Sequence, residues 1–205
     1  MPSLVHMQDT IDKLMASRDV LVLELGCGDR KRHSDAIGID VLDCDGVDIV
    51  GDIYTVLQHF PDQSISAVYA YHCFEHLLNL NDIMVQLSRV MKTKAALQVV
   101  VPHFSNPYYY SDATHRQPFG LYTFSYFAHE TLFTRKCPHY QRNLNFVLKK
   151  ARLVFKSPRP FYGRWAIKRV VQAIFNLNHY LMEFYEENLC WVIPCYEIDF
   201  ELERL

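Results

Sequence analysis

An acid and two glycines lie close together near the start of the chain. Glu24 follows a run of Val and Leu, and Gly26 and Gly28 come two and four residues later. Glycine is favoured where the backbone adopts positive φ or must approach a ligand closely. Cys27, between the glycines, is expected to pack as a small residue rather than act as a nucleophile. The pattern predicts a ligand-binding turn, but a dinucleotide fingerprint is excluded because Lys31 stands where its third glycine belongs.

A second group of reactive side chains lies further along the chain. His72, Glu75 and His76 spell H-x-x-E-H, the pattern of the inverted zinc peptidases. Two histidines at this spacing can share one zinc ion when both lie on one helix, while the glutamate polarises water. Because His72 ends a run with the character of a strand, a zinc hydrolase is only a remote alternative.

Two more histidines follow in a segment rich in aromatic residues. Histidine titrates near a pH of about 6.5, so His72, His103 and His115 could each accept a proton at neutral pH. Our first candidate for a general base is His103, followed by His115 with Asp112 orienting it. Each could equally be a hydrogen-bonded structural histidine.

Regular elements must position these side chains. Apolar runs rich in Val, Ile and Leu recur in the first hundred residues, a pattern typical of strands buried on both faces of a parallel sheet. We expect strands at residues 20–25, 36–39, 47–50, 65–70 and 95–101. Residues 80–91 carry apolar side chains at helical spacing, with Asn79 or Asn81 placed to cap that helix.

The second half of the chain is less regular at first. Residues 102–120 are rich in Pro, aromatic and polar residues, and their length indicates a functional loop. Residues 143–156 predict a sixth strand, residues 164–189 a long helix and residues 195–205 a closing strand with alternating faces. His72 and His103 would then follow the fourth and fifth strands, at the edge where open parallel sheets bind ligands.

The first two connections of the predicted sheet are too short for helices. Seven residues, 29–35, separate Gly28 from the second strand, and residues 41–46 form the next connection. A crossover helix of about ten or more residues cannot fit in either. We therefore expect loops in both places and a sheet thinly covered on those sides, where the carboxyl-terminal helix or a second subunit would pack.

Composition limits the classes of protein. The 205 residues, 50% of them hydrophobic, suit one domain spanning 1–205, and the net charge of −2 favours no particular partner. No Asp or Glu occurs in residues 131–182, which hold eleven Lys and Arg. Six cysteines without a CxxC pair make a reduced, cytoplasmic setting the simplest expectation. No apolar run approaches the ~18 residues of a membrane span.

Several motifs together resemble the class I S-adenosylmethionine (SAM) dependent methyltransferases. The E-x-G-x-G turn is similar to their motif I, and Asp40 and Asp52 match the acids that close the second strand and follow the third. Residues 60–77, ending in Glu-His-Leu, look like motif IV. Arg30 replaces the third glycine of motif I, and a usual glycine pair before the fifth strand is absent. The resemblance covers residues 20–130.

This resemblance implies an α/β fold, a Rossmann-like, mostly parallel seven-stranded sheet with helices on both faces, shortened early helices and an antiparallel last strand. Residues 1–130 would form the cofactor-binding core, and residues 131–205 would complete the sheet and the acceptor side. Asp40 would bond the ribose hydroxyls of SAM, and Asp52 would lie near the adenine amine. Asp43, Asp45 and Asp48 are expected to be solvated loop acids. The residues expected to bind SAM are Glu24, Gly26, Cys27, Gly28, Asp40, Val41, Asp52, Ile53, Tyr71 and His72.

The resemblance also implies the reaction. Methyl transfer from SAM yields S-adenosylhomocysteine and needs positioning and proton removal, so we predict no metal. The most plausible acceptor is a small polar molecule, such as a hydroxyl of a sugar, nucleotide sugar or saccharide. The expected walls of the acceptor pocket are Phe104, Tyr108, Tyr109, Tyr110 and Arg116.

The basic region supports a second class of function. An acceptor that carries phosphate, an anionic membrane surface or RNA could each bind cations interleaved with aromatic residues, although nucleic acid is the less favoured partner. The alternative is a non-catalytic methyltransferase-fold protein that binds a partner here, and the basic face could also balance acids across a homodimer. The cations are Lys149, Lys150, Arg152, Lys156, Arg159, Arg164, Lys168 and Arg169.

Overall fold

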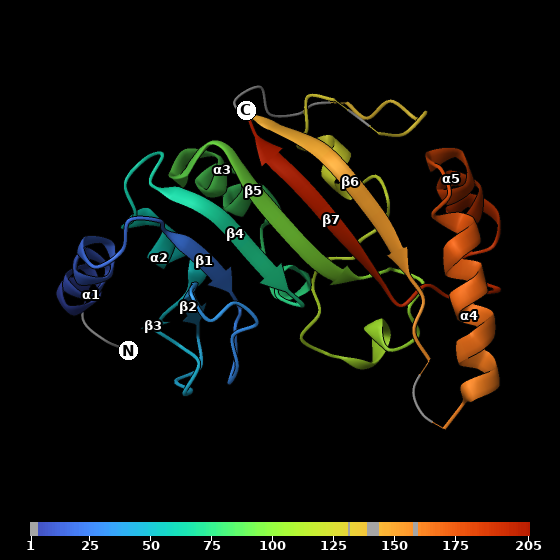
Figure 1. The fold of residues 1–205 in the computed structure, drawn as a ribbon, viewed down its shortest axis with the longest axis horizontal. Helices are drawn as coiled ribbons and strands as arrows, with labels where there is room; N and C mark the ends of the chain where they lie inside the picture. Colours follow the sequence, from blue (N-terminus) through green and yellow to red (C-terminus); the bar gives the residue numbers. More distant parts are fainter. Residues whose placement is uncertain (1–3, 131, 139–143, 158–159) are drawn as a thin grey trace.

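A seven-stranded sheet with strand order β3-β2-β1-β4-β5-β7-β6 runs through the molecule (Figure 1). The computed structural model describes residues 4–130, 132–138, 144–157 and 160–205. Strands β1 to β5 pair in parallel, and β7 pairs antiparallel with β5 and β6, as predicted for the last strand. The strands are β1 (Val22–Leu25), β2 (Ile37–Asp40), β3 (Ile49–Val50), β4 (Ile65–Tyr71), β5 (Met91–Pro102), β6 (Phe146–Val154) and β7 (Glu197–Arg204).

The apolar runs form strands because their side chains fill the core. Leu23, Leu25 and Val68 are fully buried in β1 and β4. The predicted helix is α3 (Leu80–Val90), and Asn79 caps it by accepting hydrogen bonds from two backbone N–H groups. β5 begins four residues earlier than predicted and continues past Lys94, whose φ of 66° accompanies an irregularity in the pairing with β4.

Two helices were not predicted from the sequence. α1 (Leu4–Ala16) inserts Met7 and Ile11 into the core, and α2 (Ile53–Gln58) begins at Asp52, whose side chain caps it. Short 3-10 turns at Phe74–His76, Tyr109–Ser111 and Thr123–Tyr126 complete the segments around the strand ends. The predicted absence of helices after β1 and β2 is confirmed, since residues 26–36 and 41–48 contain none.

The predicted long helix is divided into α4 (Tyr162–Phe175) and α5 (His179–Asn188). Asn176 ends α4, and its side-chain amide bonds both the N–H and the carbonyl of Leu153 in β6. Asn178 begins α5 by accepting a hydrogen bond from Leu181 N. The prediction of a single helix was therefore wrong. The first helix ends at Asn176, whose side chain bonds the backbone of β6, and the second begins at Asn178, whose side chain caps it. The start of the predicted sixth strand, Asn143, lies outside the described residues.

One face of the sheet carries no helix over its central strands. In Figure 1, α1 lies at the left end and α4 and α5 at the right end, beside β6. Over β4, β5 and β7 the outward side chains of this face are polar and bond one another. The Tyr71 hydroxyl donates to Gln98, and Gln98 donates to Asp199 at 2.9 Å. The sequence predicted that the carboxyl-terminal helix or a second subunit would pack on the β1 to β3 side, and of these the helix is excluded because α4 and α5 lie beside β6.

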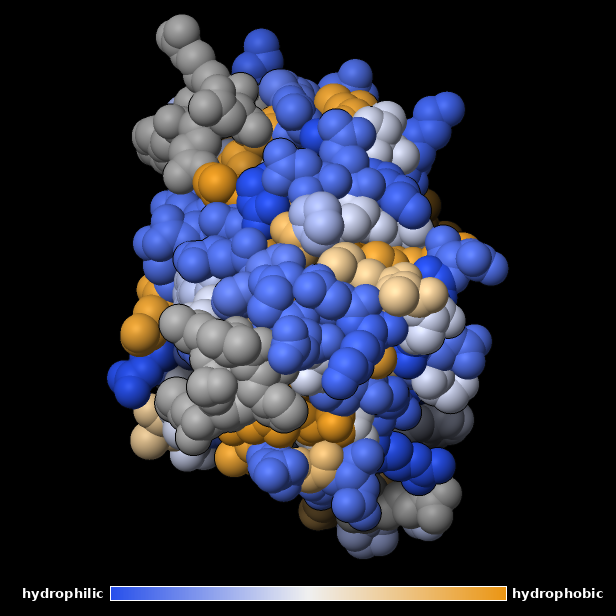
Figure 2. Space-filling view, turned by 90° about the vertical axis from the view of Figure 1, so that its left-hand side faces the viewer, coloured by the Kyte–Doolittle hydropathy of each residue, from blue (hydrophilic) through white to orange (hydrophobic). Residues whose placement is uncertain are grey.

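The basic region is partly neutralised within the sheet. Lys149, Lys150 and Lys156 lie 3.6, 2.7 and 2.5 Å from carboxylates of β7. Arg159 lies outside the described residues. Figure 2 faces the α1 end, where the coloured surface is mostly hydrophilic and apolar residues show in small separate groups. Within the described residues, no helix has the length and apolar character needed to cross a membrane.

Candidate functional site

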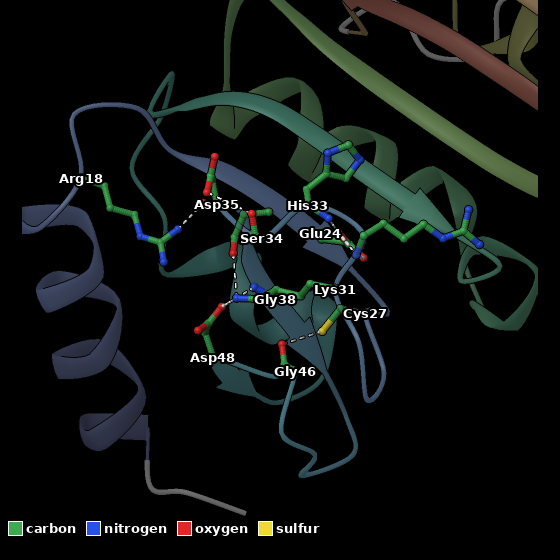
Figure 3. Close-up of polar contacts among 12 residues, drawn as sticks. Arg18, Glu24, Cys27, Lys31, His33, Ser34, Asp35, Gly38, Gly46 and Asp48 are labelled. Atoms are coloured by element: carbon green, nitrogen blue, oxygen red, sulfur yellow. Dashed lines mark hydrogen bonds and ion pairs between the residues drawn. The ribbon is translucent and has the colours of Figure 1, made fainter.

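Glu24 anchors the loop that replaces the first crossover helix. It is 2% exposed in β1, and its carboxylate accepts hydrogen bonds from the backbone N–H groups of Arg32 and His33 at 2.9–3.0 Å (Figure 3). The loop also packs on the open sheet face, where the His33 ring stacks on Tyr69 at 3.6 Å and Arg32 lies over Tyr71. One buried carboxylate and side-chain stacking thus hold this loop against the sheet, in the place where a crossover helix would normally pack.

The two early loops are tied to each other. Asp48 accepts hydrogen bonds from the Lys31 ammonium at 2.6 Å and from the Gly38 N–H at 2.7 Å (Figure 3). Asp48 was expected to be a solvated loop acid, and that prediction is wrong because both partners come from the neighbouring segments. The Cys27 thiol faces the Gly46 carbonyl at 3.6 Å. The loops therefore form one packed unit at the carboxyl edge of β1 and β2.

A cavity of about 470 Å³ opens beside this unit. Its lining comes from the ends of β1, β2 and β4 and from the start of α2, the carboxyl edge where open α/β sheets bind ligands. Six of the ten residues predicted to bind SAM line it: Gly26, Asp40, Val41, Asp52, Ile53 and His72. The sequence reasoning missed Leu42, Tyr54, Cys73, His76, Leu77 and Leu78 as lining residues.

Gly26 is required at the floor of this cavity. Its φ is 65°, and a Cβ atom on it would lie 2.7 Å from both Cβ and Sγ of Cys73. Asp40 accepts hydrogen bonds from Gly28 N at 2.9 Å and Leu42 N at 3.0 Å, so it shapes the glycine turn from below. Each carboxylate oxygen accepts one of these bonds and keeps lone-pair capacity for a ligand hydroxyl.

The other four predicted cofactor residues do not line the cavity. Glu24 is committed to the loop backbone, and Gly28 donates its N–H to Asp40. Burial, with help from Asp40 and Glu24, raises the pKa of the Cys27 thiol to about 11, so Cys27 is protonated at neutral pH and is not a nucleophile. Tyr71 points to the open sheet face, where its hydroxyl lies 2.8 Å from His33 Nε2. The prediction of Tyr71 as a cofactor residue is wrong because alternate residues of a strand face opposite sides.

His72 lines the cavity but cannot be a general base. Its φ is 53°, and its two ring nitrogens lie 3.1 Å from Glu197 and 3.3 Å from Glu75. Hydrogen bonds to Glu197 and then Glu75 raise the pKa of His72 to about 9, so it keeps its proton at neutral pH. The H-x-x-E-H alternative is also wrong, because Phe74–His76 is a single 3-10 turn and His72 is bound by carboxylates.

His103 was the first candidate for a general base, and the structure contradicts it. The side chain is 0% exposed, and it lies outside the lining of the cavity. Its Nδ1 bonds the hydroxyl of Ser105 at 2.7 Å, and its Nε2 lies 3.1 Å from the Glu186 carboxylate of α5. His103 therefore joins β5 to α5 and has no ring nitrogen free to meet an acceptor.

Asp112 and His115 do come together, as predicted, but with added partners. His115 Nε2 lies 3.6 Å from Asp112 Oδ2, and His115 Nδ1 bonds the carbonyl of Tyr109 at 2.9 Å. Asp112 Oδ1 accepts a 2.6 Å hydrogen bond from Thr114, whose hydroxyl contacts His76 Nδ1 at 2.9 Å. The long loop thus brings His115 and the cavity residue His76 side by side, with ring centroids 4.8 Å apart.

The residues predicted to wall the acceptor pocket are dispersed. Phe104 lines a separate cavity of about 670 Å³ with residues of α5, and Tyr108 lines one of about 340 Å³ with Lys156, Arg164 and Lys168. Tyr109 is buried against His115, and Tyr110 is exposed. Arg116 is exposed, and its N–H donates to the Glu75 carbonyl. No single aromatic pocket forms from these described residues.

Comparison with known proteins locates the fold. No protein-family model and no curated protein matches this sequence. A SAM-dependent methyltransferase from Archaeoglobus fulgidus is similar in structure, with 14% identity, a TM-score of 0.57, and 98% of this chain and 93% of that chain covered. Phosphoethanolamine N-methyltransferase 2 of Haemonchus contortus, in complex with SAM, has 13% identity and a TM-score of 0.52, covering 97% of this chain and 52% of that chain.

A third similar structure is the 16S rRNA (adenine(1408)-N(1))-methyltransferase of Catenulisporales acidiphilia with SAM. It is 13% identical with a TM-score of 0.51, and the alignment covers 97% of this chain and 91% of that chain. Strand order and the antiparallel β7 agree with this likeness. The chain therefore has the Rossmann-like fold of the class I SAM-dependent methyltransferases.

Proposed function

We propose that the protein is a SAM-dependent methyltransferase that binds SAM in the cavity beside Gly26. The observation that carries this proposal is that one cavity collects Asp40 and Asp52 together with apolar walls. Val41, Leu42 and Leu78 are 64%, 62% and 76% exposed, which is high for large apolar side chains that share a cavity. An adenosyl group would cover them, and solved proteins of this fold hold SAM.

Each polar group has a matching part of SAM. Asp40 keeps lone pairs for the two ribose hydroxyls. Asp52 Oδ1 caps α2 through Tyr54 N, which leaves Oδ2 for the adenine amine. The backbone of Gly26 allows the methionine part to approach closely. No helix follows β1, so binding depends on these groups rather than on a helix dipole at the glycine turn.

The acceptor is a small polar molecule, and a hydroxyl of a sugar, nucleotide sugar or saccharide is the favoured class. Arg164 and Lys168 face the cavity that Tyr108 lines, where they suit a phosphate. Lys156 belongs to the same cavity and pairs with Glu197, which bonds His72 of the SAM cavity. This chain of contacts supports an acceptor that spans both cavities.

The reaction is an in-line displacement. The acceptor oxygen forms a bond to the methyl carbon while the carbon–sulfur bond breaks, and S-adenosylhomocysteine leaves as a neutral thioether. The acceptor also loses its proton to water, on the side of the cavity where His76 and His115 lie. Because His72 keeps its proton, it contributes positive charge and position instead.

Calorimetric titration with SAM tests the cofactor assignment. We expect Asp40→Asn to weaken binding about 10- to 100-fold, the equivalent of a ~1.5–3 kcal/mol hydrogen bond to a charged group. Asp43→Asn, an exposed acid of the same loop, is the matched control and should bind like the wild type. Wild-type protein that is folded but shows no SAM binding would overturn the proposed function, and unchanged binding by Asp40→Asn would overturn the site.

An acceptor screen read by S-adenosylhomocysteine release tests the substrate class. Nucleotide sugars are compared with the same sugars lacking phosphate. If the basic cavity holds phosphate, Arg164→Ala should raise KM for the phosphorylated acceptors about tenfold while kcat stays close to wild type. Arg18→Ala, in the loop after α1, serves as the control for loss of one arginine. Equal KM values for both acceptor sets would contradict the phosphate assignment.

One observation favours a second candidate function, binding to an anionic membrane surface through α4. Trp165, Ile167 and Val170 are 53%, 64% and 60% exposed on this helix, beside Arg164 and Arg169. Basic amphipathic helices with aromatic anchors lie flat on such surfaces. In sedimentation with vesicles containing phosphatidylserine, the wild type should then be found in the vesicle pellet and Trp165→Ala in the supernatant. If the wild type does not sediment with the vesicles, this candidate function is wrong.

A further inference from the structure

Three side chains with metal-ligating atoms meet at the edge of the SAM cavity. Glu75 and His76 belong to the turn after β4, and His115 belongs to the long loop after β5. One possible ligand atom from each lies within 4.8 Å of the others. His76 also lines the cavity, so this cluster lies at the cavity wall.

Glu75 has an oxygen that nothing in the described structure satisfies. The residue is 1% exposed, and its Oε1 lies 3.3 Å from His72 Nδ1. Its Oε2 is buried and has no hydrogen-bond partner. Leaving a buried hydrogen-bond acceptor unpaired costs about 1–3 kcal/mol, and more where the acceptor carries charge. A buried carboxylate oxygen of this kind, held in place by His72, points to a missing ligand.

The hydrogen bonds of His115 fix which of its nitrogens can bind a ligand. Its Nδ1 lies 2.9 Å from the carbonyl oxygen of Tyr109, which can only accept. Nδ1 therefore carries the proton and donates it, and Nε2 of neutral His115 carries the lone pair. Asp112 Oδ2, 3.6 Å from that Nε2, adds negative charge at the same point.

His76 is held in the same way through one more residue. The Thr114 hydroxyl lies 2.6 Å from Asp112 Oδ1, and a carboxylate can only accept, so Thr114 donates to it. The Thr114 oxygen must then accept from His76 Nδ1, 2.9 Å away. Nε2 of His76 is thus also left with its lone pair. Both histidines have the bonding that metal-binding histidines show, one nitrogen donating to an oxygen and the other left with its lone pair, although His115 Nε2 also has Asp112 Oδ2 3.6 Å away.

We infer that Glu75, His76 and His115 bind a divalent transition-metal ion of the zinc type. Two imidazole nitrogens and one carboxylate oxygen are the protein ligands of open catalytic zinc sites, which keep a fourth position for water or substrate. Bonds of about 2.0–2.2 Å require the ligand atoms to close to roughly 3.4 Å apart. The exposed side chain of His76 can supply most of that movement.

The cation would act on the acceptor. This role rests on the proposed methyltransferase function. Binding of the cation is independent of that function. An acceptor hydroxyl in the open position would lose its proton to water more readily because the cation stabilises the alkoxide. That alkoxide oxygen then forms its bond to the methyl carbon as the carbon–sulfur bond breaks. With His72 protonated and His103 buried, this provides an alternative to a protein base.

Binding of Co²⁺ and Zn²⁺ to metal-stripped full-length protein tests the inference. Co²⁺ is followed by its visible absorption, and Zn²⁺ by calorimetry in competition with a chelator. We expect one site per chain, lost or weakened at least tenfold in Glu75→Gln, His76→Ala and His115→Ala. His179→Ala, on α5, removes a histidine far along the chain and should bind like the wild type.

A second variant covers the case in which Glu75→Gln does not fold. Thr114→Val keeps all three ligands and removes only the bond that orients His76, so it should weaken Zn²⁺ binding about tenfold while circular dichroism is unchanged. Wild-type protein without a Co²⁺ band, or binding that survives both histidine substitutions, would overturn the inference. If cysteines elsewhere in the chain held the zinc, its binding would survive both histidine substitutions.

Parallel SAM titrations separate the two proposals. If SAM binds and the metal does not, the proposed function stands and the metal site is wrong. If the metal binds and SAM does not, the site stands and its role in methyl transfer is lost. Where both bind, chelation should abolish S-adenosylhomocysteine release without changing SAM affinity more than a few fold, and unchanged turnover after chelation would overturn the role in catalysis.

Discussion

Two glycines of one turn differ in what their neighbours allow. Gly26 has a φ of 65° and no room for a Cβ, which would meet Cys73 at 2.7 Å. Gly28 has a φ of 57° with nothing within 4 Å of the position of a Cβ. The first position combines backbone strain with a steric conflict, whereas the second has strain alone. This contrast permits a test with an internal control.

Gly26→Ala should destabilise the protein far more than Gly28→Ala. A left-handed conformation costs an alanine about 1–2 kcal/mol, and overpacking adds about 1–3 kcal/mol. We therefore expect a loss of about 2–5 kcal/mol in the free energy of unfolding for Gly26→Ala and about 1–2 kcal/mol for Gly28→Ala. Urea denaturation measures both. Equal losses would show that Cys73 does not limit the space at residue 26.

Residue types alone could not assign the histidines. The sequence put His72, His103 and His115 near one sheet edge, and it could not show which ring nitrogens were already bonded. Nε2 of His72 is bonded to Glu197 and Nε2 of His103 to Glu186, and each glutamate lies more than 80 residues further along the chain than its histidine. Asp40 and Asp52, which the resemblance matched to cofactor-binding acids, both line the cavity, and each lies no more than two residues beyond a predicted strand.

At the scale of elements, the loop of residues 29–35 depends on Glu24. Replacing the carboxylate by an amide in Glu24→Gln presents an NH₂ group to the N–H groups of Arg32 and His33. We expect a loss of about 1–3 kcal/mol in stability and faster hydrogen exchange at those two amides. Asp35→Asn, an exposed acid of the same loop, should stay within about 0.5 kcal/mol of wild type. Unchanged exchange at Arg32 and His33 would contradict this role of Glu24.

Strand β7 joins two parts of the site through Glu197. Its carboxylate is 6% exposed and pairs with His72 of the β4 end and Lys156 beyond β6. Glu197→Gln removes the charge that both cations face, and we expect about 1–3 kcal/mol of destabilisation in chemical denaturation. Glu201→Gln on the same strand breaks an ion pair with Lys150 in which both side chains are about half exposed, and should cost less than ~1 kcal/mol. A larger effect at Glu201 would contradict the ranking by burial.

The elements that the sequence predicted are those with strong local patterns. α3 has buried apolar residues on one face and an asparagine cap, and the early strands are nearly continuous apolar runs. α1 and α2 were missed because only Met7 and Ile11 are buried among residues 7–16 of α1, and α2 has only six residues. The division between α4 and α5 depends on Asn176 bonding β6, a contact that no local pattern reveals.

For the whole molecule, the shortened connections have a visible consequence. Without helices after β1 and β2, part of one face of the sheet is covered by the loop of residues 29–35, whose His33 stacks on Tyr69 and whose Arg32 lies over Tyr71. Hydrogen bonds such as that from Gln98 to Asp199 replace part of the packing that helices give to most parallel sheets. The cofactor side is therefore built largely from loops, and its order should depend on the ligand.

Ligand binding should stabilise the whole fold measurably. A ligand at about 100 times its Kd adds about 2.7 kcal/mol when it binds only the native state, and each kcal/mol raises Tm by about 2–4 °C in a chain of this size. SAM should thus raise Tm by roughly 5–10 °C in wild-type protein. Asp40→Asn at the same SAM concentration should show at most half of that shift, because its Kd is higher. An equal shift in both proteins would mean that SAM stabilises the fold from a site that does not include Asp40.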